Sequence, residues 1–215
     1  MLLIFNIFEL GVKEGEKNSY VAVGKNNITK SVLNDEGTLG MYLVQEKENP
    51  NMTYMFEVYE DEKSYQEHVK SEQYKEFLKK SPAILTNHKK KIQVVPEYME
   101  DKKFVQTRNT RVNYVTVDVK EGFNDAFREI VLDEMKQSIK KEEGVYVIYA
   151  ATTTENPNKW YFFEIYENEK AYQKHRKTAH FKKYIEQTEN IIENKEFINI
   201  EGVKLLNKGN LNYVK

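Results

Sequence analysis

Two stretches of this chain repeat each other so closely that they must be copies of one unit. The segment NPNMTYMFEVYEDEKSYQEHVK begins at Asn49 and NPNKWYFFEIYENEKAYQKHRK begins at Asn156, an offset of 107 residues, and 14 of the 22 aligned positions are identical. The same offset relates Asn6 to Asn113 without a gap. A period this long is that of a domain and not of a solenoid repeat. The sequence therefore predicts a tandem duplication.

Each copy predicts the same order of elements: strand, helix, strand, strand, helix, strand. Apolar and β-branched residues mark strands at 2–10 and 112–119, and apolar residues recur at helical spacing between Phe123 and Ile139. In the first copy Gly24, Asn26 and Asn27 predict a shorter or looser helix. The other expected elements are strands at 41–47, 54–60, 145–153 and 160–167, helices at Glu62–Lys80 and Glu169–Glu189, closing strands near Lys91–Val95 and Phe197–Ile200, and a polar linker from Glu97 to Arg111.

This order of elements predicts an α+β fold of two ferredoxin-like, or split βαβ, domains, at residues 1–102 and 103–215. In such a domain the helices cover one face of an antiparallel sheet and leave the other face apolar. Two copies can bury these faces against each other, so we expect the sheets to pack as an intramolecular pseudo-dimeric α/β barrel. Exposed strand edges would allow a further homodimer.

The composition limits the possible partners and chemistry. With 33 basic and 34 acidic residues the formal net charge is −1, which favours neither nucleic acid nor an anionic membrane as a partner. The absence of cysteine excludes disulfides, thiolate nucleophiles and Cys-ligated metals. The apolar start MLLIFNIFEL is too short to span a bilayer and lacks signal-peptide features. We therefore expect a buried strand there and a cytoplasmic protein.

One pattern of residues in each copy resembles a known family. An aromatic strand contains a glutamate followed by an aromatic residue, and a helix with a histidine and a Ser/Thr-x-His-aromatic motif come next. The second copy has Glu164, Tyr166, His175 and Thr178-Ala179-His180-Phe181, and the first has Glu57, Tyr59, His68 and Ser71-Glu72-Gln73-Tyr74. This pattern resembles the antibiotic biosynthesis monooxygenase family of dimeric α/β-barrel enzymes, over nearly the whole chain. The family includes quinone-forming monooxygenases that use neither metal nor flavin, an isomerase of a phosphorylated sugar and haem-degrading enzymes, so the fold does not decide the reaction.

Haem degradation is not expected. The haem-degrading proteins that this chain resembles carry a Trp where it has His68 and His175. Their iron-ligating His stands ten residues further on, where this chain has Leu78 and Ile185. Neither side chain can bind iron.

The resemblance implies an oxygenase without a cofactor, in which the substrate supplies the electrons. Such an enzyme needs a base, an apolar pocket and donors to a developing anion. His175 is the candidate base, because an unperturbed histidine titrates at about pH 6.5. Glu164 shares one strand face with Phe162 and Tyr166, and a carboxylate among aromatic rings needs a partner. We expect His175 and Glu164 to form a catalytic pair.

Further residues are expected to contact the substrate. Asn113 and Tyr166 are placed to orient a substrate oxygen, and the remaining candidates for substrate binding are His180, Phe162, Asn6, Glu57, Tyr59 and His68. Each has a structural alternative: Glu164 bonded to backbone or to a lysine, His175 at the edge of the core, and His180 capping the turn after a helix kink. His175, His180 and Glu164 could also ligate a metal, but the resemblance implies that no metal is bound.

Three functions remain open on the sequence. The first is a monooxygenase that acts on a small phenolic or quinol-type molecule, and the absence of a Gly-rich phosphate cradle favours this aromatic substrate. The second is an isomerase or other proton-transfer enzyme on a small polar metabolite, and the third is a non-enzymatic small-ligand-binding protein. The first copy has Gln73 where the second has His180, so we expect the better site in the second copy.

Overall fold

The computed structural model describes residues 2–215, which divide into two compact units. Unit 1 contains the residues up to Val94, together with 103–106 and 199–209. Unit 2 contains 95–102, 107–198 and 210–215. Each unit is therefore built from one copy of the repeat and two short segments that lie elsewhere in the chain.

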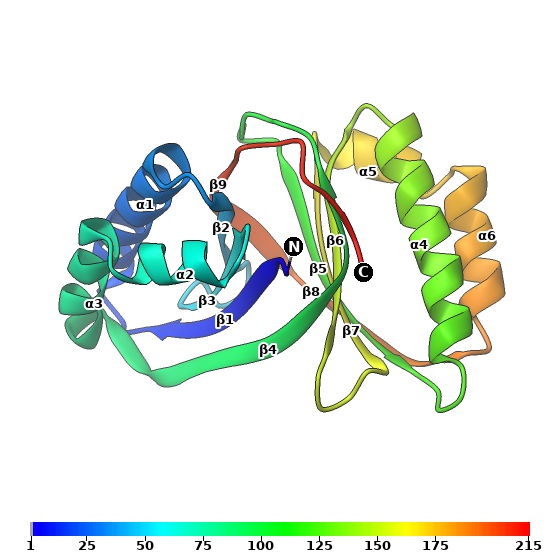
Figure 1. The fold of residues 1–215 in the computed structure, drawn as a ribbon, viewed down its shortest axis with the longest axis horizontal. Coiled ribbons are helices and arrows are strands. Elements are labelled where there is room, and N and C mark those ends of the chain that lie inside the picture. Colours follow the sequence, from blue (N-terminus) through cyan, green and yellow to red (C-terminus); the bar gives the residue numbers. More distant parts are fainter. Residues whose placement is uncertain (1) are drawn as a thin grey trace. The chain divides into compact units, whose positions relative to one another are not determined.

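Unit 1 is an antiparallel sheet with three helices on one face (Figure 1). Its elements are β1 (Ile4–Val12), α1 (Lys17–Asn34), β2 (Thr38–Glu46), β3 (Met52–Tyr59), α2 (Glu62–Val69), α3 (Glu72–Ile84), the first part of β4 (Leu85–Asp101) and β9 (Ile200–Asn207). The strand order is β4-β1-β3-β2-β9. The outer strand β9 comes from residues near the C-terminal end of the sequence, and it pairs with β2 in the register Met41 to Leu206 and Tyr42 to Leu205.

Unit 2 has the same architecture. Its elements are β5 (Arg111–Val119), α4 (Asn124–Lys141), β6 (Val145–Thr153), β7 (Lys159–Tyr166), α5 (Glu169–His175), α6 (Ala179–Thr188), β8 (Ile192–Ile198), β10 (Asn212–Val214) and the second part of β4. The strand order is β8-β5-β7-β6-β4, and β10 also pairs with β4. The predicted tandem of ferredoxin-like repeats is confirmed. None of the helices within residues 2–215 is long and apolar enough to cross a membrane.

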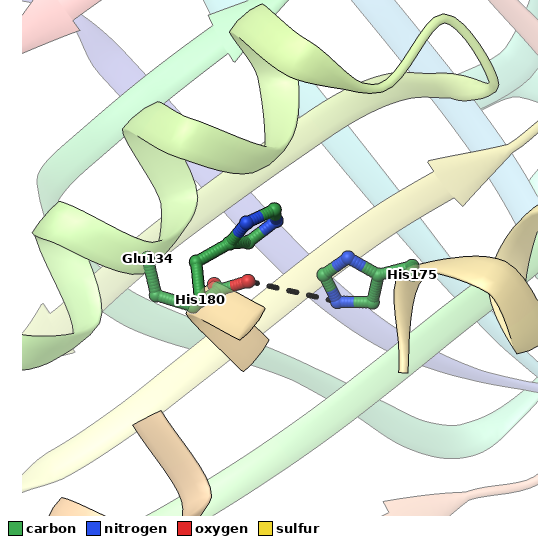
Figure 2. A group of neighbouring side chains, drawn as sticks. All are labelled: Glu134, His175 and His180. Atoms are coloured by element: carbon green, nitrogen blue, oxygen red, sulfur yellow. Dashed lines mark ion pairs between the residues drawn. The ribbon is translucent and has the colours of Figure 1, made fainter. Parts of the chain in front are cut away.

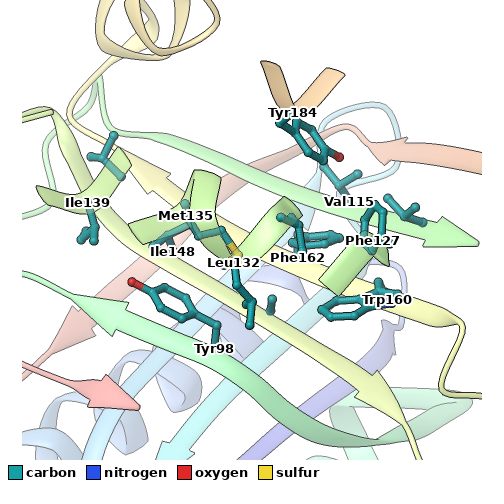
Figure 3. Close-up of a cluster of buried hydrophobic side chains, with 14 of the residues drawn as sticks. Tyr98, Val115, Phe127, Leu132, Met135, Ile139, Ile148, Trp160, Phe162 and Tyr184 are labelled. Carbon is teal, nitrogen blue, oxygen red and sulfur yellow. The ribbon is translucent and has the colours of Figure 1, made fainter. Parts of the chain in front are cut away.

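The core of unit 2 lies between α4 and the sheet (Figure 3). The ring of Phe127 on α4 meets that of Trp160 on β7 edge-on, with 5.2 Å between centroids, and both side chains are fully buried. In unit 1 the matching positions hold Tyr20 and Thr53, whose hydroxyls are hydrogen-bonded at 3.2 Å. A large apolar pair in one copy thus corresponds to a smaller hydrogen-bonded pair in the other. Truncating such an aromatic residue to Ala costs about 3–5 kcal/mol.

The prediction of a shorter first helix in the first copy is wrong. Helices α1 and α4 each have 18 residues. Gly24 packs against the sheet, where a Cβ would lie 3.0 Å from Leu43 Cδ2, so glycine permits the close approach of helix and strand. The buried Asn27 accepts a hydrogen bond from Ser31 Oγ at 3.3 Å. This packing outweighs a helix penalty of about 1 kcal/mol for Gly.

The predicted second helix of each copy is in fact two helices. Ser71 begins α3 and Thr178 begins α6, and their hydroxyls accept hydrogen bonds from the backbone N–H of Tyr74 and Phe181 at 3.3 and 3.2 Å. Such caps satisfy N–H groups that have no partner within the helix. The break places His180 in the first turn of α6.

The predicted linker and closing strands also differ from the structure. Strand β4 continues to Asp101, and Glu97 to Met99 are buried in it, so the first part of the expected linker is a strand. The expected strand Lys91–Val95 lies inside β4, and the expected strand Phe197–Ile200 is divided between β8 and β9. The many charged residues of these segments hid the run of buried residues from Pro96 to Met99.

Candidate functional site

His175 ends α5 and is almost completely buried in unit 2. Its Nδ1 lies 3.0 Å from Oε1 of Glu142, the residue that caps the C-terminus of α4. His180 Nε2 lies 2.7 Å from the same oxygen. One carboxylate oxygen from the end of α4 therefore holds both histidines of the sequence motif.

Glu134 contacts the other nitrogen of the His175 ring, and Figure 2 draws this ion pair as a dashed line. Its Oε1 lies 3.7 Å from His175 Nε2 and accepts a hydrogen bond of 2.6 Å from Ser138 Oγ. Burial raises the pKa of Glu134 to about 7, although the His175 charge and the Ser138 bond act in the opposite direction. Glu134 is thus a buried carboxyl group that gains or loses its proton near neutral pH.

The pKa of His175 shifts in the direction that favours its cation. Burial alone would lower this pKa, but the hydrogen bond to Glu142 and the negative charges of Glu134 and Glu164 outweigh burial and raise it. Burial alone would raise the pKa of Glu142. The hydrogen bonds to His175 and His180 outweigh burial, so the pKa of Glu142 is lowered. The imidazolium of His175 is therefore the favoured form when Glu142 is ionised.

A small internal cavity of about 40 Å³ lies beside these groups. Its walls include the polar side chains of Glu134, Glu164, His175 and Lys195 and the rings of Phe162, Tyr172, Phe181 and Tyr184. A single water needs about 10–15 Å³ by this measure, and a cavity that admits benzene measures about 150 Å³. The cavity has room for a few water-sized groups and not for an aromatic ring.

Glu164 does not pair with His175, so this expectation is wrong. Its Oε2 accepts hydrogen bonds from Asn113 Nδ2 at 3.2 Å and from Tyr166 Oη at 2.9 Å, and Asn113 Oδ1 accepts one from Arg111 Nε at 2.9 Å. The carboxylate partners of His175 come from α4 and its end instead. Glu164 and Phe162 line the cavity as expected, while the side-chain amide of Asn113 and the hydroxyl of Tyr166 are directed to Glu164.

The first copy keeps part of this arrangement in unit 1. Tyr59 donates to Glu57 at 2.9 Å, and Asn6 faces Glu57 across the β1–β3 ladder. Burial raises the pKa of Glu57 to about 7, against the effect of the Tyr59 bond. His68 lies with Nδ1 3.5 Å from Asp35 Oδ2, and burial lowers the pKa of His68 in spite of Asp35.

The acidic and basic groups around the first-copy histidine differ from those around His175. Gln73 replaces the second histidine and donates to both carboxylate oxygens of Asp35, at 3.2 and 3.0 Å. At the offset of 107, Asn27 stands where unit 2 has Glu134. Unit 1 therefore has no carboxyl group on its first helix at this place.

Three side chains of unit 2 could hold a metal ion. One ligand atom each from Glu134, His175 and His180 lies within 4.8 Å of the others (Figure 2). Glu142 contacts Nδ1 of His175 and Nε2 of His180, so the other nitrogen of each ring is the one that a metal would bind.

Sequence reasoning missed Glu134 and Glu142, and a signal for Glu134 was present. Glu134 follows Phe127 by seven residues and Val131 by three, so it lies on the apolar stripe that faces the sheet. An acidic residue on such a stripe needs a reason to be there. Glu142 gave no signal, because it lies at a helix end among other charged residues.

Two solved structures resemble the whole chain. A protein from Lactobacillus acidophilus NCFM matches with a TM-score of 0.94 and 27% identity, covering 99% of this chain and 100% of that one. A protein from Fusobacterium nucleatum matches with a TM-score of 0.93 and 29% identity, covering 100% and 98%. Both are described as putative monooxygenases.

A more distant structure shares only the fold. An anthrone oxidase-like protein matches with a TM-score of 0.55 and 10% identity, covering 96% of this chain and 97% of that one.

Among curated protein sequences none matches the chain. The profile of one family matches twice, at residues 3–80 and 110–187, which is most of both copies. The chain belongs to the antibiotic biosynthesis monooxygenase family, with two tandem family domains.

Proposed function

We propose that the chain is a cofactor-independent monooxygenase that oxidises a small phenolic or quinol-type molecule in unit 2. One observation carries this proposal: Glu134, a buried carboxyl group with a pKa of about 7, lies 3.7 Å from the imidazole of His175 at the wall of a cavity. Groups that exchange protons in catalysis work best when their pKa is near the working pH. Family membership and the two whole-chain relatives support a monooxygenase-like role.

The pKa directions assign different roles to the two groups. Glu134 ionises near neutral pH and is the proposed proton acceptor for a substrate hydroxyl. His175, whose pKa is raised, is the proposed cation that stabilises the resulting phenolate, because a fixed charge in a dry site acts strongly on a developing anion. Asn113 and Tyr166, which donate hydrogen bonds to Glu164, are proposed to hold its carboxylate at the wall of the cavity.

The reaction needs no external reductant. A hydroquinone that loses its proton to Glu134 becomes an electron-rich anion that reacts with dioxygen. One oxygen atom forms a new C–O bond on the ring and the other leaves as water, so that one hydroquinone and one O₂ give one hydroxyquinone and one H₂O. The ring supplies all the electrons, and the proton taken by Glu134 leaves with the water.

The test is oxygen uptake by the purified protein with a panel of hydroquinones and phenols. We expect uptake by the wild-type protein and a decrease of at least about 100-fold in His175→Ala, as is usual for the loss of a group of this kind. His68→Ala in unit 1 is the matched control, because it removes the equivalent buried ring, and it should keep most of the activity. Equal loss in both variants would contradict a site in unit 2.

The same panel separates the other functions. The Glu134 and His175 pair could also move a proton on a small polar metabolite without oxygen. Conversion of such a compound under anaerobic conditions, with no uptake for any phenol, would identify a proton-transfer enzyme. Binding without any conversion would identify a ligand-binding protein.

A further inference from the structure

A groove on the surface of unit 2 leads to the internal cavity. It has a volume of about 460 Å³, and its walls include Arg111, Tyr172, Arg176, Phe181, Lys195 and Phe197. The rings of Tyr172, Phe181 and Phe197 and the side chain of Lys195 also line the cavity of about 40 Å³. The groove has the volume for an aromatic ring that the cavity lacks, so a substrate ring is expected in the groove with only a substituent reaching inward.

Two of the cations in this groove have no anionic partner within ion-pair distance. Among residues 2–215, no carboxylate lies within 4.0 Å of the guanidinium of Arg176 or of Lys195 Nζ, whereas Arg111 pairs with Glu169 at 2.9 Å. Lys195 is half-buried, and burial lowers its pKa, although the more distant charges of Glu164 and Glu134 act in the opposite direction. A partly desolvated cation without a partner is costly, and an anion in the groove would relieve that cost.

Aromatic rings hold these cations in place. The guanidinium carbons of Arg111 and Arg176 lie 4.9 and 5.8 Å from the centre of the Tyr172 ring. Lys195 Nζ lies 5.4 Å from the centres of both the Tyr184 and Phe197 rings. Such contacts fix the position of a cation without neutralising it, and they place positive charge beside flat apolar surface.

The first copy lacks most of this arrangement. At the offset of 107, Ile4 and Val69 stand where unit 2 has Arg111 and Arg176. By strand register the counterpart of Lys195, which pairs with Val117, is the exposed Lys89, which pairs with Leu10. Unit 1 does hold one cation in a related position, because Lys91 Nζ lies 5.0 Å from the centre of the ring of Tyr65, the counterpart of Tyr172. The arginines of the groove are therefore a property of unit 2 and do not follow from the shared fold.

We propose that the site of unit 2 binds an aromatic molecule that carries an anionic group such as a carboxylate. This proposal rests on the proposed function for the chemistry of the ring. Arg176 and Lys195 bind the anionic group, and Tyr172, Phe181 and Phe197 contact the ring. A hydroxyl group of the ring reaches the cavity beside Glu134 and His175.

The test compares gentisate, which is hydroquinone with a carboxylate, with its neutral analogue 2,5-dihydroxybenzamide. Binding is measured by calorimetry at neutral pH and low salt under anaerobic conditions, so that turnover plays no part. We expect gentisate to bind at least about tenfold more tightly than the amide, a difference of about 1.4 kcal/mol. The double variant Arg176→Gln/Lys195→Met should lose this preference and keep its affinity for the amide.

Lys89→Met is the matched control, since it removes one lysine from the equivalent strand position of unit 1, and it should leave the preference unchanged. If Lys195→Met disturbs folding, the exposed Arg176→Gln alone should still lower the preference several-fold. Equal affinity for gentisate and the amide would overturn the inference even if hydroquinone drives oxygen uptake. Preferential binding of gentisate without oxygen uptake in air would support the inference and contradict the monooxygenase.

Discussion

The imidazole of His175 is joined to Glu142, with 3.0 Å between Nδ1 and Oε1, in a site where both side chains are almost completely buried. The same contact raises the pKa of His175 and lowers that of Glu142, in each case against the effect of burial. It therefore couples the charge of the proposed site to the stability of unit 2.

Replacing Glu142 by Gln should destabilise the protein in a pH-dependent way. A raised histidine pKa stabilises the fold below the unfolded value of 6.5, and this contribution is lost as the pH rises through the folded pKa. A lowered glutamate pKa stabilises the fold above pH 4.5, and this contribution is lost as the pH falls through the folded pKa. Glu142→Gln should thus lower the free energy of unfolding by about 1–3 kcal/mol at pH 5–6.5 and by less at pH 9. Urea unfolding at both pH values checks this, and a loss that does not depend on pH would argue against the ion pair.

Replacing Glu134 by Gln should stabilise the protein at high pH. The pKa of Glu134 rises from 4.5 in the unfolded chain to about 7 in the fold, so its ionisation costs stability as the pH rises through this range. The amide avoids that cost, and one pKa unit corresponds to about 1.4 kcal/mol. We expect Glu134→Gln to raise the free energy of unfolding by up to roughly 3 kcal/mol at pH 8.5 relative to wild type and to change it little at pH 4.5. The variant should also lose oxygen uptake. A variant that loses both activity and stability at pH 8.5 would contradict this account of Glu134.

Replacing Leu205 by Asp should destabilise unit 1, although Leu205 is more than 100 residues from the first copy in the sequence. Leu205 is buried in β9, which forms the edge of the unit 1 sheet beside Tyr42 of β2. An unpaired charge there should cost at least about 3 kcal/mol. Hydrogen exchange should accelerate for the amides of β2 and remain slower in β6. Val214→Asp, at an exposed position, is the control, and faster exchange confined to unit 2 would contradict the assignment of β9.

The pairing of β9 with β2 in the sheet of unit 1 is a feature that the sequence could not predict. The repeat gave the duplicated order of elements, because 14 identities in 22 positions at one offset leave no other explanation. The register of β9 on β2 depends on contacts between residues more than 150 positions apart, and no local pattern encodes such pairing. The prediction for the helix around Gly24 was wrong for the same reason. This helix packs against Leu43, and a local helix propensity does not include such a contact.

Some residues of the candidate site were predictable from the sequence, but Glu134 and Glu142 and their contacts with His175 were not. His175, Glu164 and Phe162 do line one cavity, because strand alternation and helical spacing put them on faces directed to the core. The partner of His175 came from α4, which no pattern in the motif includes. A buried carboxyl group on an apolar stripe, as at Glu134, is the signal that would have corrected the pairing.

Metal ions should have little effect on the protein. Glu134, His175 and His180 offer ligand atoms within 4.8 Å of one another, but the raised pKa of His175 favours its protonated ring, and a metal binds only the neutral ring. We expect Zn²⁺, Mn²⁺ or Fe²⁺ to change the melting temperature by no more than about 2 °C, and protein dialysed against EDTA to keep its oxygen uptake. A larger rise that disappears in His180→Ala would instead establish a metal site.

Rebuilding the second-copy groups in unit 1 tests whether those groups are sufficient. The changes are Asn27→Glu, Asp35→Glu and Gln73→His, made in the His175→Ala background so that unit 2 is inactive. Ser31 stands where Ser138 binds Glu134, so the new glutamate has a hydroxyl partner, and His68 supplies the second imidazole. We expect oxygen uptake with neutral hydroquinone to return to at least a few per cent of the wild-type rate, because Ile4 and Val69 leave unit 1 without the arginines that would favour an anionic ring. Adding His68→Ala should abolish the recovered uptake. A folded variant with no uptake would mean that the groove of unit 2, and not the buried acid beside the histidine, limits activity.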